Sequence, residues 1–483
     1  MLGCFGDFIA ARRLEHRNFD RDFFEKRSAL TKNQMLKIKF FLPLIFAAAF
    51  SAQAYGEASL IRDAQTEKLL HEIANPIFLA ANLDPKNIKI YIVNDDSINA
   101  FVSGGQNVFI NIGLITKYPT PDALIGVLAH ETGHITGGHL ARSSEGQSEA
   151  QGAMLLSYLL GIGAAAAGAP DAAAALILGG SQTAQRLYAR FTRTQEEAAD
   201  QYAIQYLAKL RYPADGLVNL LEFFEAESKA NANQIDEYLL SHPVSRKRID
   251  LIKARTASQN FSDKKINQKL QHAFTLTLAK LEGFTKNPQS TLEKYKNRTD
   301  DAALYAKSIA LFKKGEVPAA AQMLDELIKR NPNDGFFYEM KGQILFEGGK
   351  VADAALAYNQ AVKHLSASDA ALAKISLAEA ILNVKGSDKD LAKLAISRLK
   401  EAKIFEEENP FLFKELATAY NKTGDKAASL LNLAEFNCLI GQKEKCQKYA
   451  KQAKDKFDKA SKTELLHADD LLEMAKEKKE EKE

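Results

Sequence analysis

The sequence predicts a mainly α-helical protein with one small β-sheet and a C-terminal solenoid of helical repeats. Apolar residues recur at helical spacing over most of the chain, whereas two short segments between residues 87 and 112 alternate and are rich in isoleucine. Near the C-terminus, glycine-centred helical segments repeat with a period of 34 residues. A chain of 483 residues, 46% of them hydrophobic and 26% charged, is long enough for about three domains and too apolar for a disordered protein.

Charge and cysteine content exclude several classes of protein. Lys and Arg total 64 while Asp and Glu total 61, so the chain lacks the concentrated basic excess of a nucleic-acid-binding protein. We therefore expect no nucleic-acid partner. Three cysteines are too few for a disulfide scaffold or for a four-cysteine zinc module. A globular protein of several domains remains.

The N-terminal region has the features of an export signal behind a short extension. Met35 is a second plausible start, Lys37 and Lys39 follow it, and residues 40–50 carry no charge. Small residues then lead to Ala54, as a signal peptidase requires, and the apolar run is shorter than the roughly 20 residues of a membrane span. We predict a non-native extension, a cleaved signal peptide and an exported mature chain, which in a Gram-negative cell enters the periplasm. An uncleaved membrane anchor is the alternative.

The segment after the signal predicts helices on either side of a β-hairpin. Alternation indicates the strands, and the Gly104-Gly105 pair supplies the turn between them. Thr120 is the expected N-cap of the second helix and Pro121 its first residue, because the N–H that proline lacks is not used there. The predicted elements are a helix over residues 57–82, strands over 87–94 and 107–112 with residues 99–102 between them, and a helix over 122–140.

The C-terminal half is built from repeated helix–turn–helix units. Gly315 and Gly349 occupy equivalent positions 34 residues apart, and Gly386 and Gly424 mark two less regular units. A 34-residue period of paired helices is typical of tetratricopeptide repeats, in which stacked units bury the apolar surface that a single unit would leave exposed. The sequence therefore predicts an α-solenoid.

A metal-binding pattern lies in the helix predicted over residues 122–140. His130 and His134 are four residues apart, so their imidazoles lie on one helical face and both can meet one ion. Glu131 lies beside the first of them and can take a proton from the attacking water instead of binding the metal. This His-Glu-x-x-His pattern is typical of zinc proteases.

Two histidines and one water leave one protein ligand to be found. His139 lies five residues after His134, whereas the metzincin pattern requires six, so we expect His139 to be structural or to support a ligand. An acidic residue on a second helix is the better candidate, since Glu196 lies one turn before Asp200. We predict that Glu196 binds the metal and that Asp200 accepts a hydrogen bond from a ligand histidine and orients its ring.

Three segments resemble the HtpX-like and CAAX-prenyl-protease-like zinc peptidases. They are AHETGHITGGH at residues 129–139, RTQEEAAD at 193–200 and SHPVSRKRI at 241–249. The resemblance implies a gluzincin-type metalloprotease domain with one zinc ion and Glu131 as the catalytic base. The implied zinc ligands are His130, His134 and Glu196. Ala198 departs from the family, which carries glutamate there, but the ligand position four residues before Asp200 is kept.

Further catalytic and substrate-binding residues are predicted around the metal. His242 begins a His-Pro pair that the family shares, and it can reach the metal or the oxyanion, hold the enzyme latent, or cap a helix. Arg248 can bind substrate carbonyl oxygens or pair with acids. The hairpin that begins at Asn99, Ala100 and Phe101 precedes the zinc helix, so its edge can receive substrate by strand addition.

Residues 152–170 carry no charge and are mostly alanine, glycine and leucine, and an apolar run resumes at Ala172. Each half is short for a membrane span, and this composition inserts weakly. We predict a helical hairpin, buried or mobile, beside the active site. Membrane contact through residues 152–180 is the alternative.

The order of signal peptide, soluble catalytic domain and repeats is similar to that of periplasmic family members that act as proteases and chaperones in outer-membrane protein assembly. The resemblance implies an endopeptidase for unfolded, misassembled or stalled envelope proteins, with repeats that dock substrates or the outer-membrane assembly machinery. A chaperone or assembly adaptor with weak or latent protease activity is the alternative. The predicted domains are an extension (1–34), a signal peptide (35–54), a zinc metalloprotease domain (55–265), a repeat domain (266–470) and a charged tail (471–483).

Two cysteines remain in the predicted mature chain. Cys438 and Cys446 flank Gly441, which is typical of a turn between antiparallel helices. Because an exported protein meets an oxidising compartment, we predict a disulfide that pins the last repeat. Two buried thiols are the alternative.

Overall fold

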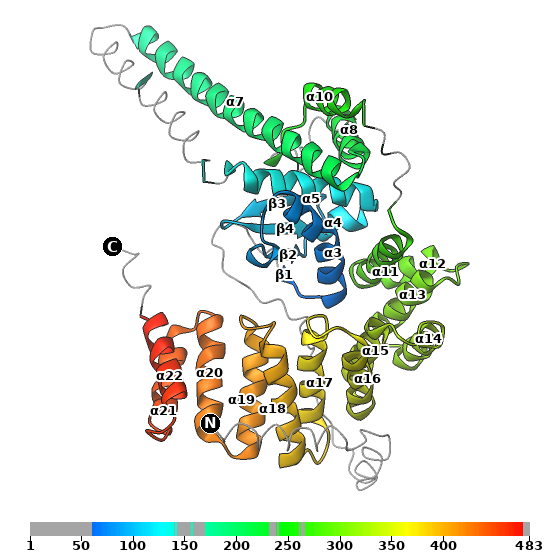
Figure 1. Ribbon diagram of the computed structural model, residues 1–483, viewed down its shortest axis with the longest axis vertical. Helices are drawn as coiled ribbons and strands as arrows, with labels where there is room; N and C mark the ends of the chain where they lie inside the picture. Colours follow the sequence, from blue (N-terminus) through cyan, green and yellow to red (C-terminus); the bar gives the residue numbers. More distant parts are fainter. Residues whose placement is uncertain are drawn as a thin grey trace. The chain divides into compact units, whose positions relative to one another are not determined.

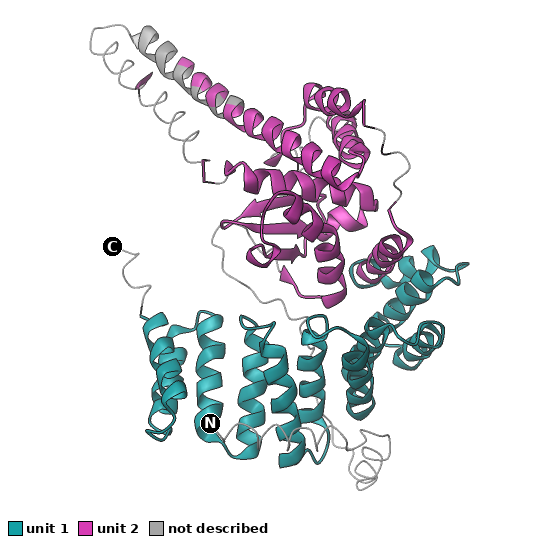
Figure 2. Ribbon diagram, viewed as in Figure 1, with its two compact units in different colours: residues 1–50, 282–483 teal, residues 51–281 magenta. Residues whose placement is uncertain are grey.

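The computed structural model describes residues 60–139, 141–142, 156–157, 170–230, 238, 241–259, 261 and 266–476. These residues belong to two compact units, one within residues 51–281 and the other from residue 282 onward (Figure 2). The predicted extension and signal peptide lie outside the described residues and stay predictions, as does most of the Ala/Gly-rich hairpin.

A small β-sheet lies in the first unit. Its strands are β1 (Leu60–Ile61), β2 (Ile90–Val93), β3 (Ala100–Ser103) and β4 (Asn107–Asn111), in the order β1-β2-β4-β3. The predicted Gly-Gly turn is confirmed, because β3 and β4 are antiparallel and their turn holds Gly104 and Gly105 at φ of 58° and 95°. The hairpin partner of β4 is β3, which covers residues placed between the two predicted strands, and not the strand predicted over residues 87–94. β2 pairs in parallel with β4, which leaves β3 at one edge of the sheet.

Two predicted helices, α3 (Ala64–Ala80) and α5 (Pro121–Thr136), pack against each other and share an apolar core with the sheet (Figure 1). α3 begins later than expected because β1 precedes it and Asp63 caps it, accepting a hydrogen bond from Thr66 N at 3.0 Å. Thr120 and Pro121 begin α5 as predicted, although the Thr120 side chain makes no capping bond among the described residues. The short connecting helices are η1 (Pro85–Asn87) and α4 (Ile112–Thr116).

Three further helices belong to the first unit: α7 (Pro170–Leu210), α8 (Asp215–Ala230) and α10 (Arg246–Thr256). α5 packs against both α7 and α8. Glycine permits the second contact, because a Cβ at Gly126 would lie 2.8 Å from the Cβ of Leu217. Among the helices that the structure describes, none is both long and apolar enough to cross a membrane.

The boundary between the two units lies later than the predicted one at residue 265. Helix α11 (Gln268–Thr285) contributes Leu270 and Phe274 to the apolar core of the first unit. The buried ammonium of Lys280 pairs with Asp63, which caps α3. The division therefore falls between Leu281 and Glu282, because the apolar face of α11 is buried by the unit that precedes it.

The second unit is the predicted stack of helical pairs. Gly315 and Gly349 end equivalent turns with φ of 82° and 77°, a left-handed conformation that other residues rarely adopt. Ala320 and Ala354 are fully buried where the paired helices meet. The helices are α12 (Pro288–Lys294), α13 (Asp301–Lys313), α14 (Val317–Arg330), α15 (Gly335–Glu347), α16 (Val351–His364), α17 (Ala371–Asn383), α18 (Lys389–Lys403), α19 (Pro410–Thr423), α20 (Lys426–Leu439), α21 (Lys443–Lys454) and α22 (Lys462–Met474).

At the C-terminal end of the second unit, the predicted boundary at residue 470 is corrected and the predicted disulfide is confirmed. α22 continues past the predicted limit at residue 470, because Leu471 is 1% exposed and packs in the last apolar cluster. Cys438 and Cys446 form the predicted disulfide, with their Cα atoms 5.1 Å apart. The bond joins α20 to α21 across the turn at Gly441, where φ is 74°.

This disulfide should stabilise the last repeats measurably. Thiol counting in denaturant without reductant should find neither Cys438 nor Cys446 free in protein from an oxidising compartment. A loop this short constrains the unfolded chain by about 2.5 kcal/mol, so the double variant Cys438→Ser/Cys446→Ser should lose about that much free energy of unfolding. Two free thiols in the oxidised protein would contradict the bond.

Candidate active site

The two predicted ligand histidines lie one turn apart on α5 and face the same point. Their Nε2 atoms are 3.1 Å apart, and their rings meet edge to face with centroids 4.8 Å apart. His130 is fully buried, whereas the side chain of His134 is 13% exposed, so the pair reaches solvent on the His134 side. The helical spacing places both imidazoles as the sequence predicts.

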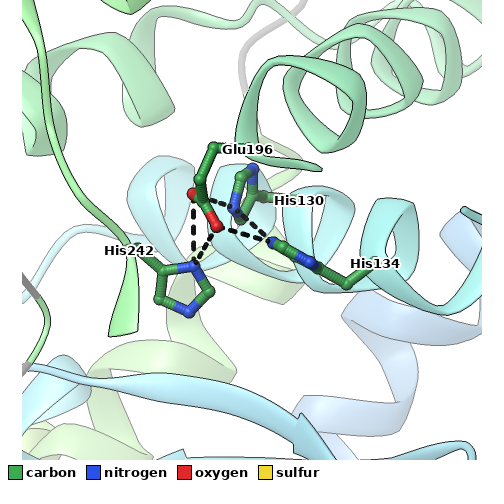
Figure 3. A group of neighbouring side chains, drawn as sticks. All are labelled: His130, His134, Glu196 and His242. Atoms are coloured by element: carbon green, nitrogen blue, oxygen red, sulfur yellow. Dashed lines mark hydrogen bonds and ion pairs between the residues drawn. The ribbon is translucent and has the colours of Figure 1, made fainter. Parts of the chain in front are cut away.

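Helix α7 brings the predicted acidic ligand to these histidines. Gly133 makes this possible, because a Cβ at that position would lie 2.6 Å from the carbonyl oxygen of Ala199. As a result Glu196 Oε2 lies 3.3 Å from His130 Nε2, and Glu196 Oε1 lies 3.3 Å from His134 Nε2 (Figure 3). The contact of the two helices therefore assembles three ligand-type side chains.

His242 joins the cluster from the loop before α10. Its Nδ1 lies 3.2 Å from Glu196 Oε1, and its Nε2 lies 3.2 Å from the carbonyl oxygen of Ala100. Its Nε2 is also 3.5 Å from Glu131 Oε1. Burial by itself would lower the pKa of His242, but the carboxylates of Glu196 and Glu131 raise it. Four residues offer ligand-type atoms that all lie within 4.8 Å of one another: His130, His134, Glu196 and His242.

The donor atoms of this cluster fit a metal ion. Asp200 Oδ1 lies 3.0 Å from His130 Nδ1, so Asp200 can accept the Nδ1 proton and leave the Nε2 lone pair directed at the cluster. Nitrogen and carboxylate lone pairs directed at one place repel one another unless a cation lies among them. Burial by itself would lower the pKa of His130, but Asp200 and Glu196 raise it to about 10, whereas burial lowers the pKa of His134 to about 3.

A buried arginine balances the carboxylates. Arg248 on α10 is 2% exposed, and its Nε and Nη2 donate to the two carboxylate oxygens of Asp200 at 2.8 and 2.9 Å. Its Nη1 lies 2.9 Å from Glu196 Oε2. Burial by itself would raise the pKa of Asp200, but Arg248 and His130 hold it below its ordinary value. Of the two roles expected for Arg248, the structure shows the pairing with acids, whereas a contact with substrate stays a prediction.

Glu131 is buried beside the ligand cluster. It is 1% exposed, and neither of its carboxylate oxygens has a hydrogen-bond partner in the part of the chain that the structure describes. Burial raises the pKa of Glu131, so this carboxylate holds a proton more readily than an exposed glutamate does. A group of this kind, next to a metal site, can accept a proton and return it.

The predicted substrate-binding residues lie at the start of edge strand β3. Ala100 is fully buried, and its carbonyl oxygen meets the ring of His242. Asn99 Oδ1 accepts a hydrogen bond of 3.4 Å from the serine that precedes His242. Phe101 stacks on a phenylalanine of β4, with ring centroids 5.0 Å apart. The start of β3 therefore lies beside the metal cluster, as the order of the sequence elements suggests.

Sequence reasoning missed Tyr238, which supports the loop histidine. It is 1% exposed, and its backbone carbonyl accepts a hydrogen bond from His242 N at 2.7 Å. Its ring lies on that of His242, with centroids 5.0 Å apart, and stacks on Phe224 at 4.4 Å. The available signal was the four-residue spacing of Tyr238 and His242, which predicts contact if the segment is helical.

The arrangement of these side chains agrees with the family models that match the chain. Residues 62–256 match the model of peptidase family M48, and residues 305–381 match a tetratricopeptide repeat model. Residues 62–256 are a family M48 peptidase domain. The matched range contains each of the four residues of the cluster and Glu131, and it ends at the last residue of α10.

Two curated relatives are similar to this chain over more than two thirds of its length. The chain is 26% identical over 335 residues to the beta-barrel assembly-enhancing protease of Yersinia pestis, covering 68% of each protein. It is 25% identical over 397 residues to the protein of that name in Escherichia coli K12, covering 80% of this chain and 71% of the relative. The metalloprotease YcaL of Escherichia coli is 28% identical over 195 residues, 40% of this chain and 70% of the relative. The chain is thus a metallopeptidase with tetratricopeptide repeats.

The two neighbouring glutamates of α7 should differ in metal binding. Glu196 faces the histidines, whereas Glu197 is 31% exposed and pairs with Lys247 at 2.7 Å. We expect Glu196→Ala to abolish stoichiometric zinc binding and Glu197→Ala to retain it, as measured by metal content after dialysis. Equal zinc content in the two variants would remove Glu196 from the ligand set.

Proposed function

We propose that this chain is an exported endopeptidase that holds one zinc ion and cleaves misfolded or stalled outer-membrane proteins. The convergence of His130, His134 and Glu196 beside the buried Glu131 is the observation that carries the proposal. The names of the relatives support the class of substrate, and the signal peptide predicted over residues 35–54 supports export to the periplasm.

The chemistry divides between the metal and the protein. Zinc held by these ligands supplies a Lewis acid that activates water for attack at neutral pH. Glu131 accepts the proton of the nucleophile and passes it to the leaving amine, because burial raises the pKa of its carboxylate, which makes no hydrogen bond to the described residues. Asp200 and Arg248 hold the ligands in position, since their contacts are with His130 and Glu196.

We propose that substrate adds as a strand beside β3. An edge strand offers backbone groups to another chain, and strand addition holds an extended peptide still while side-chain pockets select among sequences. Asn99, Ala100 and Phe101 start this edge next to the metal cluster. Unfolded outer-membrane proteins expose many segments that can form β-strands, and such segments could pair with the edge of β3.

His242 acts as a plug in this proposal. Its ring lies against the ligand carboxylate of Glu196 and meets the carbonyl of Ala100, a group that an incoming strand would approach. Tyr238 holds the ring in that place. The enzyme is therefore latent until the loop that carries His242 moves. The variant His242→Ala decides whether His242 inhibits catalysis or assists it.

The repeats are proposed to dock the client or the outer-membrane assembly machinery. Stacked helical pairs present an extended concave surface, which binds extended peptides or partner proteins. A chaperone or adaptor with weak or latent proteolysis is the second candidate function, and the buried His242 beside the ligands favours it.

Glu131→Gln separates metal binding from catalysis. We expect the variant to retain one zinc per chain and to lose at least about 100-fold in the rate of casein cleavage, because general base catalysis contributes about that much. Metal content and cleavage with and without chelator are measured on the same preparation. Cleavage at the original rate would contradict the assigned role of Glu131.

His242→Ala should raise the rate of casein cleavage and of self-cleavage, with the zinc content unchanged. The reason is that the substitution frees the space beside Glu196 and the Ala100 carbonyl. A fall in cleavage with zinc retained would mean that His242 assists the reaction, and the plug would then be wrong.

Removing the repeats should separate cleavage from selection of clients. Residues 55–285 retain α11, which the first unit needs for its core, and should still cleave casein. The same fragment should no longer co-purify with outer-membrane assembly proteins when these are captured from envelope extracts of the source cell. Undiminished association of the fragment would show that the repeats only stabilise the fold.

A further inference from the structure

Among the described residues, Nδ1 of the second proposed ligand, His134, has no carboxylate partner, whereas Nδ1 of the first, His130, has one. His130 Nδ1 faces Asp200, a strong acceptor that leaves the Nε2 lone pair free for a metal. His134 Nδ1 instead lies 3.0 Å from Nδ1 of His139, and the two rings meet edge to face with centroids 4.9 Å apart. The Nδ1 atom of His134 therefore faces a histidine, whereas the Nδ1 atom of His130 faces a carboxylate.

The turn after α5 is shaped to hold His139 in this position. His139 is 7% exposed although it lies beyond the end of the helix. Gly137 has an ordinary φ of −69°, but a Cβ there would lie 2.4 Å from His139 Nε2, so the close approach of the ring requires glycine. Gly138 has φ of 62°, which turns the chain back over the helix end.

A second helix also ties His139 to the site. Gln195 Nε2 donates a hydrogen bond of 3.2 Å to the backbone carbonyl oxygen of His139. Gln195 directly precedes the ligand Glu196 on α7, so the same stretch of helix positions both the acidic ligand and His139. The backbone of His139 is thus tied to the helix of Glu196, while its ring contacts His134.

The hydrogen bond between the two Nδ1 atoms has two possible directions, and only one allows metal binding. If His139 donates, His134 accepts at Nδ1 and must carry its proton on Nε2, which cannot then bind a metal. If His134 donates, its Nε2 lone pair is free and points at His130 Nε2, 3.1 Å away. His139 must then be neutral with its proton on Nε2, the atom that lies against Gly137.

We propose that His139 is a positioning residue that accepts a hydrogen bond from the Nδ1–H of His134 and so fixes the tautomer and ring orientation of this ligand. The inference rests on the proposed zinc site and adds to it. His139 does not bind the metal, because its Nδ1 faces the far nitrogen of His134. A neutral imidazole in this place orients the ligand without a further negative charge, at a site that already holds Glu131, Glu196 and Asp200.

The test is the affinity of the full chain for zinc alone, measured by competition with a chelator of known affinity. We expect His139→Leu to raise the zinc dissociation constant about 10- to 100-fold, the usual effect of losing a residue that orients a metal ligand. His139→Asn should restore most of the affinity, because its Oδ1 replaces the Nδ1 acceptor. Gly137→Ala should weaken zinc binding like His139→Leu, since the added methyl displaces the ring.

A matched control and a stability measurement separate positioning from a merely structural role. His272→Leu replaces an exposed histidine on α11 of the same unit and should leave the zinc affinity unchanged. Thermal unfolding of each zinc-free variant reports damage to the fold. If His139→Leu fails to fold, the zinc affinities of Gly137→Ala and His139→Asn still test the proposal. A zinc affinity of His139→Leu within about twofold of the original, or an equal loss in the Leu and Asn variants, would overturn the proposal. Failure of the original chain to bind zinc would instead overturn the proposed function.

Discussion

The close contact of α5 and α7 at Gly133 is the constraint on which the rest of the site depends. A side chain at this position would meet the carbonyl oxygen of Ala199 at 2.6 Å, so only glycine lets the helix of the two histidines come this near to the helix of the acidic ligand. The contact places Glu196 3.3 Å from both histidine nitrogens and lets Asp200 reach the outer nitrogen of His130. A glycine between two ligands is therefore as necessary to the site as the ligands themselves.

Charge within the site is buried, and a folded protein tolerates buried charge when each group has a partner. Glu196 and Asp200 share Arg248, which reaches both from α10. Glu131 differs, because its carboxylate oxygens have no hydrogen-bond partner among the described residues and its Oε1 lies 3.5 Å from His242 Nε2. A buried carboxylate without hydrogen bonds lowers stability, and such groups gather where a reaction needs a perturbed pKa. The pairing thus distinguishes the residues proposed to hold the metal from the residue proposed to move protons.

The two units meet different physical demands. In the repeats each helical pair buries its apolar face against its neighbours, so the stack needs only contacts between residues that are close in sequence. Side chains on its outer faces are then available for recognition, and the disulfide between Cys438 and Cys446 closes the turn between α20 and α21. The first unit depends on contacts between distant segments, as when α11 completes its core and Lys280 reaches Asp63. The proposed catalytic site needs this global order, whereas the proposed docking surface needs only a stable local scaffold.

Features set by neighbouring residues could be predicted from the sequence alone. The spacing of His130 and His134, the hairpin at Gly104-Gly105 and the 34-residue repeat follow from backbone periodicity and turn geometry, which act over a few residues. Only the tertiary structure decided the parallel pairing of β2 with β4, the packing of α11 in the first unit and the burial of Arg248. It also placed the His139 ring against Nδ1 of His134, where the sequence left open whether His139 is structural or supports a ligand. These contacts join segments whose meeting depends on which apolar faces are buried together, and no local pattern in one chain carries that information.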